Sequence, residues 1–121
     1  MKVGIVQSSY IPWRGYFDFI AQVDLFILFD DVQIGSSRSW RNRNAIKTRF
    51  GPKWLTVPLK KHSRSQLIMD TAIDWSSAWP ADHLARFSEA YDRCSHFNDA
   101  FELFQDIAHN TWHMARFEKA A

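Results

Sequence analysis

The chain has a single cysteine, Cys94, which excludes an internal disulfide and fits a reducing compartment. No apolar run approaches the roughly 20 residues that a membrane-spanning helix needs. Met1 and Lys2 lead directly into a strand pattern, without the apolar segment of a signal peptide. Internal repeats, low-complexity tracts and linkers are also missing from the sequence. We therefore expect one cytoplasmic domain over residues 1–121, without membrane contact.

Carboxylates are missing from one long stretch. None of the 13 acidic residues lies between Asp31 and Asp70, yet this stretch holds nine of the 15 lysines and arginines. The net charge is only +2, so the positive charge is concentrated in this stretch and the protein as a whole is not strongly basic. The pair Asp30 and Asp31 directly precedes it, which predicts a site with two poles. Its carboxylates could bind a cation, a hydroxyl or an amine, and its cations an anion such as phosphate.

Two short apolar segments, Lys2–Gln7 and Leu25–Phe29, are typical of buried strands. Pro12 suits the first turn of a helix between them, and Phe17 and Ile20 give that helix an apolar stripe. A strand, a helix and a strand within about thirty residues predict a βαβ unit, with parallel strands and a right-handed crossover.

Polar residues follow both predicted strands. Gln7, Ser8 and Ser9 come after the first strand, and Asp30 and Asp31 come after the second. Because ligands bind beyond the carboxyl ends of parallel strands, we expect these residues to lie together at a site. Adjacent strand residues point opposite ways, so only one of the two carboxylates should face it. That carboxylate could bind a metal, accept a proton or anchor a sugar hydroxyl; the alternative is a turn cap.

The middle of the chain predicts an antiparallel hairpin. Its arms are Trp40–Phe50 and Trp54–Lys60, on either side of the turn dipeptide Gly51-Pro52. The remaining sequence predicts two helices. The expected fold class is therefore α/β: a βαβ start, a mixed sheet extended by the antiparallel hairpin, and C-terminal helices that cover it.

Alternation along the first hairpin arm separates basic side chains from amides. The basic set is Arg41, Arg43, Lys47 and Arg49, and the amides on the other face are Asn42 and Asn44. A guanidinium binds phosphate oxygens through two N–H groups. The alternative is a solvated strand face whose charge prevents aggregation. Asparagine is uncommon in strands, so the two amides need partners, from a ligand or from the turn that follows the acidic pair.

The last predicted helix carries more apolar residues than one face needs. Its stripe is Phe97, Phe101, Phe104 and Trp112, whereas Ile107, Met114 and Phe117 lie off the stripe. We expect this second surface to form a homodimer through the last helices. His109 and His113 have the spacing of a zinc pair, but a glutamate after His109 and a third ligand are missing. We predict no metal site, and the sequence identifies no cofactor.

Four segments in this order resemble the WbqC-like protein family: Gln7–Phe17, Phe29–Gln33, Asn42–Lys47 and Trp54–Pro58. The resemblance implies a cytoplasmic protein of O-antigen or other surface-polysaccharide synthesis, acting on a nucleotide-linked, amino-bearing sugar as a transferase or modifying enzyme. Two features differ from the family pattern. The first motif reads Val6-Gln7-Ser8 where members often have histidine or methionine before the glutamine and proline after it. The chain is also short, as expected for a reduced member or for one lacking the family's C-terminal portion.

Together, residues and resemblance define a candidate site for a phosphate-bearing small molecule. Its candidate catalytic residues are Asp30 and Asp31. The candidate substrate-binding residues are Gln7, Tyr10, Trp13, Gln33, Arg41, Asn42, Arg43, Asn44 and Lys47. Tyr10 and Trp13 flank the expected helix start and could stack on a base or sugar, or simply pack.

Two other functions remain open. One is a single-stranded nucleic-acid-binding module, in which Trp40 and Trp54 stack bases. The near-neutral net charge and the acidic pair argue against it. The other is a shortened, non-catalytic family member that binds a partner protein.

Overall fold

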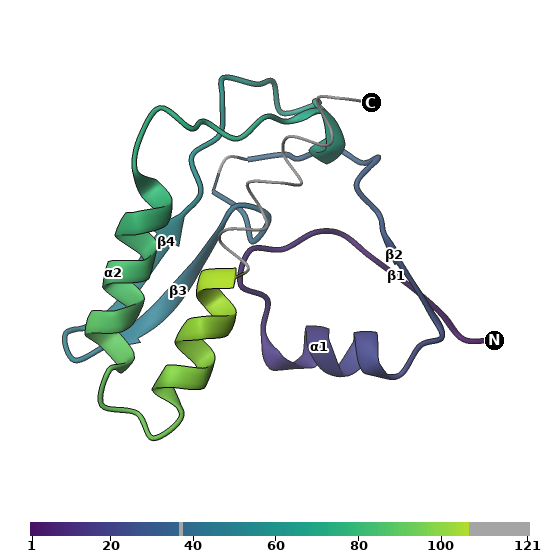
Figure 1. The fold of residues 1–121 in the computed structure, drawn as a ribbon. Helices are drawn as coiled ribbons and strands as arrows, with labels where there is room; N and C mark the ends of the chain where they lie inside the picture. The colour runs from purple at the N-terminus through teal and green to yellow at the C-terminus, as the bar shows by residue number, and fades with distance from the viewer. Residues whose placement is uncertain (37, 107–121) are drawn as a thin grey trace. The chain divides into compact units, whose positions relative to one another are not determined.

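A computed structural model describes residues 1–36 and 38–106 (Figure 1). Its elements are β1 (Val3–Val6), α1 (Arg14–Ala21), β2 (Leu25–Leu28), β3 (Arg43–Thr48), β4 (Gly51–Thr56), the 3-10 helix η1 (Ile68–Asp70) and α2 (Trp79–Tyr91). A further helix starts at residue 97 and is described to residue 106. The predicted α/β class is confirmed, except that β1–β2 and β3–β4 form two separate two-stranded sheets.

The chain divides into two compact units. Unit 1 holds Met1–Asn44 and Trp54–Asp74. Unit 2 holds Ala45–Lys53 and the described residues from Trp75 onward. The two strands of the hairpin therefore contribute to both units, whereas the βαβ start lies entirely in unit 1.

The predicted βαβ unit is present in unit 1. Strands β1 and β2 pair in parallel, with Val3 opposite Leu25 at one end of the register. Gly4, in β1, allows helix α1 to approach the sheet closely. A Cβ atom there would lie 2.9 Å from Cζ of Phe19 and 3.1 Å from Cγ1 of Val23, so a larger residue would force these side chains to shift.

The prediction of which face of α1 is buried is wrong. Helix α1 begins at Arg14 rather than at Pro12, and its buried residue is Tyr16. Phe17 is 54% exposed and Ile20 is 36% exposed. Tyr16 places its ring 5.8 Å from the ring of Phe26 while its hydroxyl reaches a backbone carbonyl. Helix α1 is therefore rotated so that Tyr16 is buried while its hydroxyl keeps a hydrogen bond.

The two strands are also less buried than predicted. Their exposed apolar residues are Val3, Ile5, Leu25, Ile27 and Leu28, each 40–57% exposed. Parallel sheets normally have both faces covered. Within the described residues, this sheet has only two strands and one crossover helix, which leaves apolar surface in contact with solvent.

The hairpin is shifted relative to its prediction. Its first strand begins at Arg43, because the carbonyl of Ser39 accepts the N–H groups of Asn42 and Arg43 at 3.2 Å and closes a turn before it. Its second strand begins at Gly51, which adopts a positive φ of 98°. Arg41 therefore lies in the turn and not on the strand face that was predicted for it.

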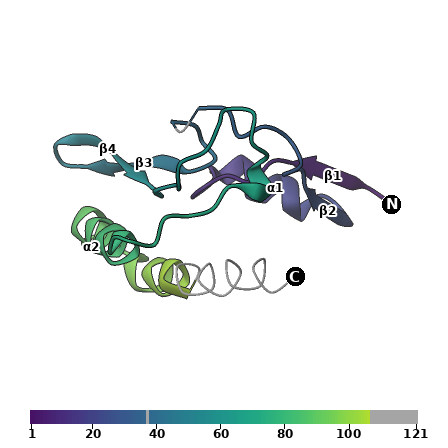
Figure 2. The same ribbon diagram turned by 90° about the horizontal axis from the view of Figure 1, so that it is seen from above.

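Unit 2 is built around aromatic contacts of α2. The ring of Phe87 lies 4.9 Å from Phe104 and 6.4 Å from Phe101, which confirms the predicted stripe of the last helix as far as residue 106. Figure 2 shows α2 beside the closed end of the β3–β4 hairpin, where the hydroxyl of Tyr91 accepts the N–H of Lys47 at 2.8 Å.

Several predictions concern residues outside the described part of the chain. These residues are Ile107, His109, Trp112, His113, Met114 and Phe117. The homodimer through the last helices therefore stays a prediction. Among the helices that are described, none is long and apolar enough to cross a bilayer.

Candidate functional site

The loop after β1 meets the residue that follows β2 and Phe29. The backbone N–H of Ser8 donates to Oδ1 of Asp30 at 2.9 Å, and the Ser8 hydroxyl donates to Oδ2 of the same carboxylate. This contact occurs at the shared strand edge that the βαβ pattern predicted. Asp31, in contrast, is exposed and has no hydrogen-bond partner among residues 1–36 and 38–106. Only one carboxylate of the pair faces this cluster.

Arg41 binds the same loop from the turn before β3. One terminal nitrogen, Nη2, donates to Oε1 of Gln7, and Nη1 contacts the carbonyl of Ser8 at 3.5 Å and Oγ of Ser9 at 3.4 Å. Donors on a charged group form stronger bonds than neutral donors. Arg41 therefore orders three successive residues of the loop and places a positive charge beside them.

Two tyrosines complete the cluster in their uncharged form. The hydroxyl of Tyr16 donates to the carbonyl of Gln7 at 3.1 Å. Burial raises the pKa of Tyr16, the negative charge of Asp30 raises it further, and the positive charge of Arg41 opposes the shift. Burial also raises the pKa of Tyr10 well above its usual value. At neutral pH both phenols keep their protons and can donate hydrogen bonds.

The loop is held in a strained conformation. Ile11 has a φ of +45°, a region that β-branched residues rarely adopt. The side-chain amide of Asn44 donates to the carbonyl of Ile11 at 2.5 Å and to that of Tyr10 at 3.3 Å. The N–H of Tyr10 donates to the carbonyl of Trp40 at 3.1 Å. Such strain persists only where surrounding contacts fix the backbone, and it is concentrated at functional sites.

Asn42 and Arg43 are engaged within the fold of unit 1. Asn42 is only 5% exposed, and its side-chain nitrogen donates to the carbonyl of Val57 at 3.1 Å. Its Oδ1 atom has no partner among the described residues. The guanidinium carbon of Arg43 lies 4.0 Å from the ring centroid of Trp54. The amide of Asn42 thus ties a turn to a strand, and Arg43 stacks on an aromatic ring.

Three further predicted binding residues have other surroundings. Gln33 is exposed and forms an isolated bridge with Leu67. Trp13 is 64% exposed and caps α1, without a side-chain hydrogen bond to the helix. Lys47 belongs to unit 2 and is exposed. Of the three, Trp13 contacts the cluster through Tyr16, with the ring centroids 5.8 Å apart.

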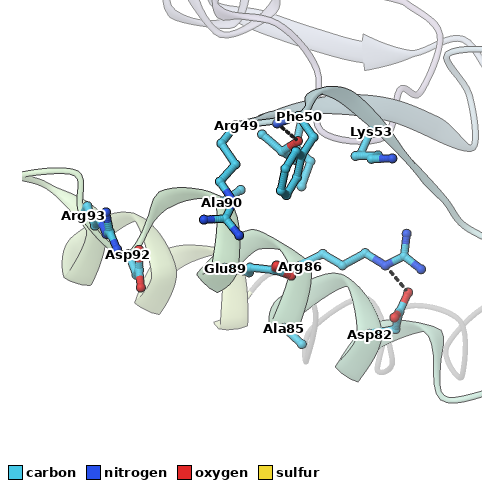
Figure 3. A pocket seen from close by; sticks show the side chains of 12 residues that line it. Arg49, Phe50, Lys53, Asp82, Ala85, Arg86, Glu89, Ala90, Asp92 and Arg93 are labelled. Atoms are coloured by element: carbon cyan, nitrogen blue, oxygen red, sulfur yellow. Dashed lines mark hydrogen bonds and ion pairs between the residues drawn. The ribbon is translucent and has the colours of Figure 1, made fainter.

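Unit 2 contains a groove of its own, with a volume of about 780 Å³ (Figure 3). It is lined by the hairpin residues Ile46, Thr48, Arg49, Phe50 and Lys53 and by the α2 region residues Asp82, Ala85, Arg86, Glu89, Ala90, Asp92 and Arg93. Its ion pair, between Asp82 and Arg86, spans 2.9 Å with both side chains about half exposed. The charges are of both signs and most are solvated, which favours the loop cluster as the candidate site.

The sequence matches the WbqC-like protein family over residues 7–118. This chain belongs to the WbqC-like protein family. The match begins at Gln7, the first residue of the ordered loop, so it includes the whole hydrogen-bonded cluster. The resemblance of the four motifs is therefore confirmed over most of the chain.

A curated relative is the uncharacterized protein Rv1507c of Mycobacterium tuberculosis, which is 50% identical over 107 residues. The matched region is 88% of this chain and 46% of the relative, so the chain spans about half of the relative's length. No solved structure matches the chain.

The sequence analysis placed Ser8 and Ser9 at the sheet edge where the site was expected, but it did not assign them a binding role. It also missed Tyr16, whose hydroxyl holds the Gln7 carbonyl. The same-edge argument that selected Asp30 could have found Ser8, since both residues follow paired strands. No comparable signal marks Tyr16, because its role depends on the rotation of α1. Among the described residues, no cluster of three His, Cys, Asp or Glu side chains could hold a metal ion.

Proposed function

We propose that this WbqC-like chain forms a substrate site for the cytoplasmic synthesis of a surface-polysaccharide precursor of the O-antigen type. The substrate is a nucleotide-linked amino sugar, and the reaction is a transfer to the sugar or a modification of it. The family links the chain to polysaccharide synthesis by its name alone. The chemistry is inferred from the loop cluster of unit 1.

The contact between Ser8 and Asp30 carries the proposal. Both carboxylate oxygens of Asp30 accept hydrogen bonds from Ser8, so the carboxylate is oriented before any ligand arrives. Each oxygen retains a further lone pair that can accept a proton donor. A sugar amine or hydroxyl is such a donor, and Asp30 would orient it or accept its proton.

Polar groups around Asp30 supply the other contacts that a nucleotide sugar needs. Among the described residues, the side-chain nitrogen of Gln7 has no hydrogen-bond partner, which leaves it available to a sugar hydroxyl. Arg41 adds a fixed positive charge beside the loop. The guanidinium of Arg43 is available to the phosphates, because its stacking on Trp54 leaves its in-plane donors free.

Thermal unfolding with a ligand panel tests the proposal. The panel contains a nucleoside diphosphate, the same nucleotide with a neutral sugar, and the same nucleotide with an amino sugar. A ligand that binds the folded state raises its stability by RT ln(1 + [L]/Kd). We expect the amino sugar to give the largest shift in wild type, and Asp30→Asn to remove the difference between the two sugars. Asp31→Asn is the matched control, since its carboxylate lies outside the cluster.

Equal stabilisation by the amino and neutral sugars would contradict the proposed substrate class.

A second candidate function is single-stranded nucleic-acid binding, which the exposed pair Trp40 and Trp54 favours. An oligonucleotide included in the panel distinguishes the two. Nucleic-acid binding would give a shift that grows with oligonucleotide length and falls steeply with salt.

A further inference from the structure

Two tryptophans of unit 1 form an exposed pair. Trp40 is 58% exposed and Trp54 is 45% exposed. Their ring centroids are 5.7 Å apart, with the planes tilted by 48°. Each indole keeps a large apolar surface in contact with solvent, and a ligand that stacks on it would remove that surface from water. The pair comes from two segments, the turn before β3 and strand β4.

A guanidinium completes this surface. Arg43 lies over the ring of Trp54, at 4.0 Å from Cζ to the ring centroid. Within residues 1–36 and 38–106, no carboxylate pairs with the guanidinium and no hydrogen bond engages it. Stacking fixes the plane of an arginine while its N–H donors point outward along the edge of that plane. The surface thus combines an aromatic face with oriented donors for an anion.

Backbone contacts fix this surface beside the candidate site. The carbonyl of Trp40 accepts the N–H of Tyr10, which belongs to the strained loop. Arg41, the next residue after Trp40, binds Gln7 through its side chain. The turn itself is closed by the Ser39 carbonyl. Trp40 therefore presents its ring outward from the same turn that orders the loop around Ser8 and Asp30.

We propose that Trp40, Trp54 and Arg43 form the nucleoside diphosphate subsite, in which the base stacks on Trp40 and the phosphates bind Arg43. This subsite rests on the proposed function, because it holds the carrier while the loop of Gln7 receives the sugar. Bases of every kind offer a π-face for stacking, so the aromatic pair selects a nucleoside without selecting its base. Arg43 supplies the bidentate phosphate contact that a lysine makes less well.

Titration with UDP, uridine and inorganic pyrophosphate tests the subsite, with tryptophan fluorescence and calorimetry as readouts. We expect UDP to quench fluorescence saturably in wild type. Trp40→Ala should weaken UDP about tenfold or more while leaving pyrophosphate binding unchanged, since stacking acts only on the base. Arg43→Ala should weaken both UDP and pyrophosphate, and Arg43→Lys should restore only part of the loss.

Unit 2 offers a matched control. Arg49 also stacks on an exposed ring, that of Phe50, at 4.6 Å. Phe50 is 74% exposed, yet the pair lies at the hairpin turn and outside the proposed subsite. Phe50→Ala and Arg49→Ala should therefore leave UDP affinity unchanged. A similar loss of UDP affinity in these controls would reduce the effect to a general property of exposed cation–aromatic pairs and overturn the subsite.

The remaining outcomes separate the subsite from the proposed function. No quenching of wild type at millimolar UDP would overturn the subsite. Tight binding of a nucleotide amino sugar that is indifferent to Trp40→Ala would overturn the subsite and leave the proposed function standing. If UDP binding depends on Trp40 but the amino sugar adds no affinity, the subsite stands and the proposed function is overturned. An oligonucleotide that binds far more tightly than UDP would assign the aromatic pair to nucleic acid instead.

Discussion

Both units of this WbqC-like chain place charged side chains beside a turn, but the two groups differ in how they are held. In unit 1, Arg41, Asp30 and Ser8 form hydrogen bonds with the loop or with one another and are partly buried. In unit 2, Arg49 and Lys53 line a groove and are exposed to solvent. A binding site requires side chains that are positioned before the ligand arrives. The comparison therefore favours the loop cluster over the groove of unit 2.

Arg41 gives the most direct test of this difference between the loop cluster and the groove. Arg41→Ala removes the donors to Gln7, Ser8 and Ser9. A hydrogen bond from a charged group contributes about 1.5–3 kcal/mol, so we expect a loss of stability of that order together with loss of ligand binding. Chemical denaturation and calorimetry would measure both effects.

Arg49→Ala is the matched control for this prediction, because Arg49 is exposed in the groove of unit 2. Exposed substitutions usually change stability by less than about 0.5 kcal/mol. If the two alanine variants lost equal stability, the distinction between a built cluster and a solvated groove would be wrong.

The acidic pair gives the second prediction. Asp30→Asn removes the charge from both Ser8 contacts and replaces one acceptor with a donor, which should cost about 1–2 kcal/mol. Asp31→Asn should leave stability nearly unchanged, because Asp31 is exposed. Urea denaturation of the two variants, compared with wild type at neutral pH, measures the difference. Equal and small effects would reduce Asp30 to an ordinary turn residue.

The parts of the fold that were predictable from sequence depend on short-range pattern. Two apolar segments with a helix between them predicted parallel β1 and β2, and the shared strand edge then predicted that Ser8 meets Asp30. Each step needs only chain connectivity and the handedness of the crossover. These predictions were correct because few chain arrangements are compatible with those rules.

The parts that were missed depend on backbone and rotational detail. Strand alternation was extended through residues 40–42, but the Ser39 carbonyl closes a turn there and redirects Arg41 toward the loop. The buried face of α1 was assigned by counting apolar residues, whereas Tyr16 prevails because its hydroxyl finds a carbonyl. Side-chain spacing does not reveal which backbone carbonyls are free, so neither feature could be predicted from the pattern.

A third prediction concerns the strain in the loop. Asn44→Ala removes the donor to the carbonyls of Ile11 and Tyr10 and should cost about 1 kcal/mol. Ile11→Gly relieves the positive φ and should regain a similar amount in that background. Denaturation of the single and double variants forms a cycle that measures the coupling. Strict additivity would mean that Asn44 does not restrain Ile11.

The smallest expected effect is in the groove of unit 2, at the ion pair of Asp82 and Arg86. The two residues are one helical turn apart on α2, with a 2.9 Å contact and side chains 53% and 50% exposed. Water and salt screen such a pair, so a double-mutant cycle of Asp82→Ala and Arg86→Ala should give a coupling below about 0.5 kcal/mol. Raising the salt concentration should weaken it further, because the Debye length shortens to about 3 Å at 1 M. A coupling above about 1 kcal/mol that resists salt would mean that the groove is held as firmly as the loop, and the contrast between the two units would no longer select the site.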